Sequence, residues 1–85
     1  MKIDHLPERN RFQTTVDEFI AYVEYSIDGQ KMNIRHTIVP KEIGGRGIAS
    51  VLVQATYEYA KAHGLIPDAT CSYAISWLQK HPEFT

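Results

Sequence analysis

Eighty-five residues allow one domain with a single core and leave no room for a second domain or a large barrel. A composition of 44% hydrophobic and 22% charged residues is typical of a globular chain, and a net charge of −1 argues against a nucleic-acid-binding surface. No apolar run reaches the roughly 20 residues that span a bilayer, and the single cysteine, Cys71, excludes an internal disulfide. We therefore expect a monomeric, cytoplasmic domain with a reduced thiol and no contact with nucleic acid or membrane.

The N-terminal half of the chain is expected to be a sheet. Residues 1–9 have no periodic pattern and are predicted to be a loose lead-in to the domain. Apolar and polar side chains then alternate with period two, which predicts strands over residues 11–16, 19–27 and 31–39. We expect these strands to form an antiparallel three-stranded meander with one mostly apolar face.

The turn Asp28-Gly29 is a strong hairpin signal, because both residues tolerate the positive φ of a primed turn. In the strand that follows, the alternation places His36 on the apolar face between Ile34 and Ile38. A histidine there is either a general base for an ammonium substrate or a core side chain hydrogen-bonded to the backbone.

The C-terminal half switches to a helical pattern. Pro40 ends the third strand, and apolar residues three or four apart predict a helix of about 15 residues from residue 48, with Gly64 at its C-terminal end. Residues 65–70 predict a short fourth strand and residues 71–80 a second short helix. The order βββαβα predicts an α/β (α+β) sandwich of one sheet and two helices.

The loop between the third strand and the first helix is the most informative segment. It holds three glycines, and residues 31–50 carry four basic side chains against one acidic. The first N–H groups of a helix lack internal acceptors and glycines let the backbone approach an anion, so the loop is suited to phosphate. A Walker A lysine is missing. A dinucleotide fingerprint needs a third glycine where Ser50 stands and a βαβ unit, and we expect neither. A glycine-rich turn without a ligand stays open as an alternative.

A family resemblance narrows this choice. The run Gly44-Gly45-Arg46-Gly47-Ile48-Ala49 resembles motif A of the GNAT superfamily of N-acetyltransferases, usually written Arg/Gln-x-x-Gly-x-Gly/Ala. The wider series is similar to the minimal, single-domain (YjdJ-type) branch of that family, through His36-Thr37-Ile38-Val39-Pro40, Gly64-Leu65, Thr70-Cys71-Ser72-Tyr73 and His81-Pro82-Glu83-Phe84. The resemblance implies a GNAT-like fold over residues 1–85 and an acetyltransferase that uses acetyl-coenzyme A.

The resemblance also implies a cofactor site. The main-chain N–H groups from residue 45 to residue 50 would hold the pyrophosphate, with the loop cations nearby and main-chain groups of the third strand beside the pantetheine arm. The residues of this site are Ile38, Val39, Lys41, Gly45, Arg46, Gly47, Ile48, Ala49 and Ser50. Gly44 departs from the family pattern, which has Arg or Gln there, so we expect a looser loop and weaker cofactor binding.

Three side chains are candidates for the chemistry. Cys71 stands where a strand passes into a helix, and the helix dipole favours a thiolate there. By the resemblance it would lie near the acetyl thioester, as a nucleophile or as part of the acceptor site, whereas a lone cysteine is most often a small buried hydrophobe. Tyr73 lies beside it and could donate a proton to the departing thiolate, and His36 is the candidate base. No histidines have metal-ligand spacing, so we expect no metal.

The expected reaction is transfer of acetyl from acetyl-coenzyme A to an amine. The N-terminal helices with which larger relatives build an acceptor pocket are missing from this sequence, so we expect a large acceptor, such as a protein side chain or terminus, that supplies its own surface. The main alternative is a non-catalytic coenzyme A-binding module. A small interaction domain that retains a relic loop is a third.

Overall fold

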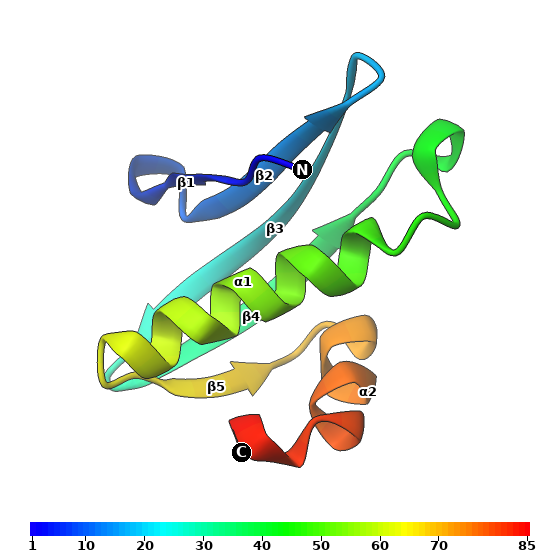
Figure 1. The fold of residues 1–85 in the computed structure, drawn as a ribbon. Helices are drawn as coiled ribbons and strands as arrows, with labels where there is room; N and C mark the ends of the chain where they lie inside the picture. Colours follow the sequence, from blue (N-terminus) through cyan, green and yellow to red (C-terminus); the bar gives the residue numbers. More distant parts are fainter.

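The computed structural model describes all 85 residues as one sheet with two helices (Figure 1). The strands are β1 (Asp4–Leu6), β2 (Arg11–Val16), β3 (Phe19–Asp28), β4 (Lys31–Ile38) and β5 (Ile66–Ala69). The helices are α1 (Ile48–Ala62) and α2 (Ser72–Lys80), and single turns of 3₁₀ helix lie at Pro7–Arg9, Lys41–Ile43 and Pro82–Phe84. From β2 onward the order is the predicted βββαβα, which confirms the α+β class.

The strands stand in the sheet in chain order, and every pair is antiparallel except β4 and β5. These two are parallel, with Lys31 opposite Ile66 and Ile34 opposite Ala69. Parallel neighbours need a crossover, which α1 supplies. The expectation that this chain lacks a βαβ unit was therefore wrong, although the third glycine of a dinucleotide fingerprint is still absent at Ser50.

Residues 1–9 are not a loose lead-in, and this prediction was wrong in its central part. Residues 4–6 form β1 and pair with β2. The His5 ring stacks on Phe12 with centroids 4.1 Å apart, and its Nε2 lies 2.6 Å from the Tyr25 hydroxyl. The Thr14 hydroxyl donates to the Lys2 carbonyl at 2.6 Å. A three-residue strand is too short to show alternation, so contacts with distant residues determine it.

One core lies between the sheet and the helices. Helix α1 buries Leu52, Tyr57 and Ala60 among others. Helix α2 buries Ala74 and Trp77, and the Trp77 ring packs against Tyr57 at a centroid distance of 5.8 Å. The buried apolar residues are Phe12, Ala21, Val23, Tyr25, Met32, Ile34, Ile43, Ile48, Leu52, Val53, Tyr57, Ala60, Ala74 and Trp77. Neither helix has the length and apolar character needed to cross a bilayer.

Candidate active site

The glycine loop presents main-chain donors at the start of α1. Gly45 and Gly47 have φ of +75° and +76°, a region that residues with a Cβ rarely adopt. The first helical hydrogen bond runs from the Val51 N–H group to the Gly47 carbonyl, 3.2 Å away. None of the six N–H groups of residues 45–50 donates to another main-chain group. Because they are consecutive and stand at the positive end of the α1 dipole, they form a cradle for an anion.

The two cations of the loop take different positions. Arg46 is exposed and forms an ion pair with Asp17, in the turn between β2 and β3, at 2.7 Å. Exposed pairs of this kind contribute little to stability, so the guanidinium can exchange Asp17 for another anion at small cost. Lys41 is also exposed, and its carbonyl accepts the Gly44 N–H group at 3.1 Å. Both cations are therefore exposed and accessible to an anion bound at the loop.

A β-bulge in β4 overturns the predicted position of His36. Tyr25 of β3 pairs with Ile34 and Glu24 pairs with His36, so Arg35 between them has no partner. The extra residue reverses the alternation, and Thr37 now pairs with the buried Val23. The side chain of His36 is 60% exposed on the opposite face, 3.9 Å from the Glu24 carboxylate.

Thr37, which the sequence did not single out, lies against Cys71. The cysteine occupies the N-cap position of α2, and its Sγ is 3.6 Å from the Thr37 hydroxyl oxygen. The chain reaches this point because the N–H groups of Thr70 and Cys71 both donate to the Ile34 carbonyl, at 3.1 and 3.2 Å. The thiol is half-buried rather than sealed in the core.

The surroundings of Cys71 favour its thiolate. Burial raises the pKa of the thiol, but hydrogen-bonding groups outweigh burial and leave the pKa below its ordinary value. The first of these is the Ala74 N–H group, followed by the Thr37 hydroxyl and the N–H groups of Tyr73 and Thr37. Since Cys71 makes no regular capping hydrogen bond to α2, the helical N–H groups act mainly as dipoles aimed at the sulfur.

Beyond Ile34, the edge of β4 is open. Pairing with β5 ends where Ile34 meets Ala69, and β4 continues past the end of β5 with β3 as its only neighbouring strand (Figure 1). Ile38 is 44% exposed, and Val39 packs partly against the core. Unpaired main-chain groups therefore line a path from the glycine loop to Cys71.

A cavity of about 210 Å³ joins the two helix starts. Ser50 of α1 and Tyr73 of α2 both line it, and the Trp77 indole N–H group donates to the Ser50 hydroxyl at 3.0 Å between them. Lys80 and His81 complete one side of the cavity. The structure thus brings together two residues that the sequence placed in separate parts of the site.

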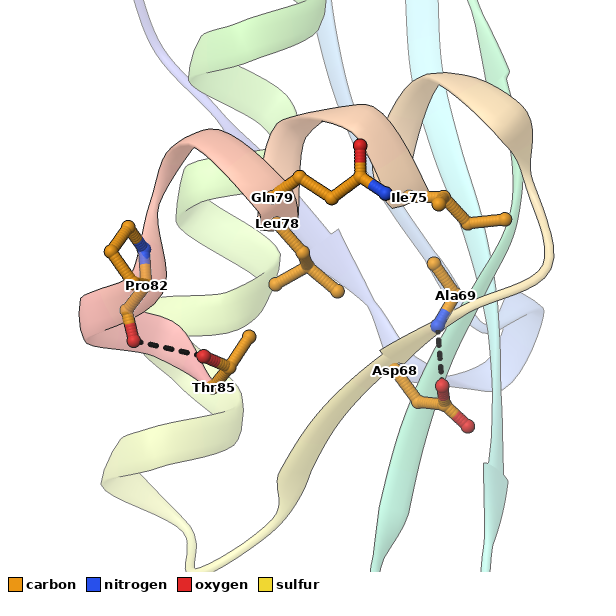
Figure 2. Close-up of a pocket in the computed structure, with 7 residues that line it drawn as sticks. All are labelled: Asp68, Ala69, Ile75, Leu78, Gln79, Pro82 and Thr85. Atoms are coloured by element: carbon orange, nitrogen blue, oxygen red, sulfur yellow. Dashed lines mark hydrogen bonds between the residues drawn. The ribbon is translucent and has the colours of Figure 1, made fainter.

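The largest cavity, about 510 Å³, lies elsewhere (Figure 2). Figure 2 shows its lining contributed by β5, α2 and the C-terminal turn, namely Asp68, Ala69, Ile75, Leu78, Gln79, Pro82 and Thr85. It contains none of the predicted site residues. Size alone does not identify the site, because the chemistry-bearing groups gather at the loop, at the β4 edge and at the start of α2.

Comparisons with known proteins agree on one family. The family model described as GCN5-related N-acetyl-transferase matches residues 11–85. Protein NATD1 of Xenopus tropicalis is 26% identical over 86 residues, covering 96% of this chain and 78% of that protein. Protein NATD1 of Mus musculus has the same identity, with 96% and 77% covered. The NMR structure of a GCN5-like candidate N-acetyltransferase from Staphylococcus aureus is 32% identical, with a TM-score of 0.76 over 98% of this chain and 82% of that chain.

Proposed function

This chain belongs to the GCN5-related N-acetyltransferase family, and we propose that it binds acetyl-coenzyme A at the start of α1 and transfers the acetyl group to an amine. Family and fold together identify it as an acetyltransferase. One observation above all supports binding of this cosubstrate. Six consecutive main-chain N–H groups, at residues 45–50, have no main-chain acceptor and stand at the positive end of a helix.

The cradle fits a diphosphate in charge and in access. A Cβ built on Gly45 or Gly47 would meet no atom of the protein within 4 Å, so the space beside these two residues is open. Arg46 and Lys41 are exposed cations of the same loop, and Lys80 lines the cavity that Ser50 also lines. These groups would hold the diphosphate and screen its charge.

The β4 edge fits the arm that leads from the diphosphate to the thioester. An extended chain with amide groups can hydrogen-bond to the free main-chain groups near Ile38 and Val39, as an added strand would. Acetyl-coenzyme A, when bound, supplies an acetyl group activated as a thioester. Since the edge runs from the loop toward Cys71, that end of the arm would lie near the sulfur.

The residues around Cys71 then take separate roles. The Cys71 sulfur, whose pKa is lowered by its hydrogen-bonding surroundings, would contact the acetyl carbonyl carbon or receive the acetyl group from it. Tyr73, exposed at the start of α2, is placed to give a proton to the thiolate that leaves. His36 lies on the other face of β4, beside Glu24, and is placed to take the proton from an ammonium group that approaches from that side.

That second face of the sheet is where we place the acceptor. Ile38, two residues from His36, is 44% exposed there, and Ile20 is 49% exposed further along β3. A small amine has no enclosed pocket on this face, whereas a protein segment can cover the exposed side chains with its own surface. We therefore propose a protein amine, on a side chain or terminus, as the acceptor.

A non-catalytic coenzyme A-binding module is the second candidate. Gly44 favours it, because the Arg or Gln side chain of motif A is missing at that position. Turnover of acetyl-coenzyme A with a panel of amines and peptides separates the two: binding without acetyl transfer to any acceptor would support the module.

An amide NMR titration with acetyl-coenzyme A tests the binding site directly. We expect the largest shifts at residues 45–50 and around Cys71, with small shifts around the cavity of Figure 2. Uniformly small shifts at the loop at millimolar ligand would contradict the proposal.

Mass spectrometry tests the covalent role of Cys71. If the sulfur attacks the acetyl carbonyl, a carbon–sulfur bond forms at Cys71 while coenzyme A leaves as its thiol, and the protein gains one acetyl group. That species should disappear in Cys71→Ala. Its absence from the wild type, together with full activity of Cys71→Ala, would show that the acetyl group passes directly to the amine.

A further inference from the structure

The bulge at Arg35 determines which side chain of β4 meets the cysteine. If β3 and β4 had paired without it, Val23 would stand opposite His36, and His36 would face the core side of the sheet. With the extra residue in place, Val23 stands opposite Thr37 instead. A bulge is costly to the ladder and is commonly found where a strand must redirect a side chain.

The Thr37 hydroxyl has a single hydrogen-bond contact in this structure. Its oxygen lies 3.6 Å from the Cys71 sulfur and makes no second hydrogen bond. Valine has nearly the same shape, so packing against Val23 does not require a hydroxyl here. The Thr37 main-chain N–H group also faces the sulfur, because this part of β4 lies beyond the end of β5.

We propose that Thr37 is a positioning residue of the acetyl-transfer site, turned by the β4 bulge so that its hydroxyl and N–H groups hold the Cys71 sulfur at the open edge of β4. The proposal rests on the proposed function, because it assigns the sulfur a place beside the acetyl group. Thr37 acts through Cys71 and through the geometry of the strand edge. It confines the sulfur to one position and stabilises negative charge on it.

The titratable groups near Cys71 do not interfere with a measurement of its ionisation. Tyr57 of α1 feels the charge of Cys71, and its pKa is raised by burial first and then by Asp68 and Cys71, so it stays neutral through the range in which the thiol ionises. Tyr73 of α2 is the other titratable neighbour, and its N–H group also faces the sulfur. The groups that lower the pKa of Cys71 are main-chain N–H groups and the Thr37 hydroxyl, none of which carries a charge.

The test is the pH profile of alkylation by iodoacetamide, in which the thiolate displaces iodide from carbon. Cys71 is the only cysteine, so the reaction of the whole protein reports this sulfur alone. In Thr37→Val we expect the midpoint of the profile to rise by about one pH unit, because a hydrogen bond to the charged form is lost. Thr37→Ser keeps the hydroxyl and should stay close to the wild type. Thr15→Val, an exposed threonine of β2, is the matched control and should not move the profile.

A Thr37→Val profile that superimposes on the wild type overturns the proposal, as does a Thr37→Ser profile that shifts as far as that of the valine variant. If Thr37→Val does not fold, Thr37→Ala is measured in its place with the same two criteria. A kinetic assay adds an independent readout, in which Thr37→Val should lower kcat several-fold while KM for acetyl-coenzyme A is kept. Alkylation needs no coenzyme A, so failure of the wild type to bind acetyl-coenzyme A would overturn the proposed function and leave the alkylation result to stand alone.

Discussion

The glycine loop allows a prediction that separates strain from ligand binding. Gly47 and Gly29 both have left-handed backbone, with φ of +76° and +63°, and a Cβ on either would meet no atom within 4 Å. Gly29 lies in the turn between β3 and β4, whereas Gly47 is the N-cap of α1. Replacing either with alanine therefore imposes the same kind of strain, and only one replacement touches the anion cradle.

The two variants should lose similar stability. A non-glycine residue in this conformation costs about 1 kcal/mol, which for a domain of this size lowers Tm by about 4–8 °C. Differential scanning calorimetry of Gly47→Ala and Gly29→Ala measures this cost. Comparable values would establish Gly29→Ala as a valid control.

The affinity for coenzyme A should differ between them. Relaxing the strain at Gly47 rotates the peptide group that carries the Ile48 N–H group, and losing one hydrogen bond to a charged group costs about 1.5–3 kcal/mol. Isothermal titration calorimetry should therefore show Kd about 10–100-fold weaker for Gly47→Ala, with no change for Gly29→Ala. Equal affinity in both variants would refute the assignment of residues 45–50 as the diphosphate site.

Three further predictions concern the loop, the N-terminal strand and the second helix. Gly44 has φ of −69°, which any residue adopts, but a Cβ there would lie 3.3 Å from the Lys41 carbonyl oxygen, so the exposed loop must shift by a few tenths of an ångström to accept one. With that small shift, Gly44→Arg should fold and bind coenzyme A more tightly, by up to about tenfold in calorimetry; unchanged affinity would contradict this. Burial lowers the pKa of His5 below 6.5, so as pH falls through that value the unfolded chain takes up the proton first and stability declines. The free energy of unfolding, measured with urea, should fall less between about pH 7.5 and pH 5 in His5→Phe than in the wild type. An equal fall in both proteins would contradict this. Trp77→Ala removes a ring that is 4% exposed and should cost about 3–5 kcal/mol of unfolding free energy; a loss below about 1 kcal/mol would mean that α2 is not anchored there.

Some of the site followed from local pattern alone. The glycine loop lies between a strand and a helix as expected, because Pro40 ends one element and the apolar spacing from Ile48 begins the next. Cys71 comes at the start of α2 for the same reason, since the helical pattern begins immediately after it. Periodicity and turn chemistry act over a few residues, so the sequence displays them directly.

The wrong predictions concern residues whose orientation depends on how their strand pairs with its neighbour. His36 was assigned to the apolar face because alternation was carried unbroken through residue 35, and nothing in the sequence near Arg35 announces a bulge. A bulge forms where it improves the fit between two strands and the layer packed on them. The sequence of one strand alone does not show that fit. Thr37 was missed as a consequence of the same step.

The sequence by itself determined the class of fold, the meander, the two helices and the place of the glycine loop between a strand and a helix, since each follows from short-range periodicity and backbone preference. Only the tertiary structure decided that residues 4–6 join the sheet, that β5 lies parallel to β4, and that Thr37 rather than His36 meets Cys71. These outcomes depend on contacts between residues far apart in the chain. The free energy of each such contact depends on which two surfaces pack together, and these surfaces meet only when the whole domain folds.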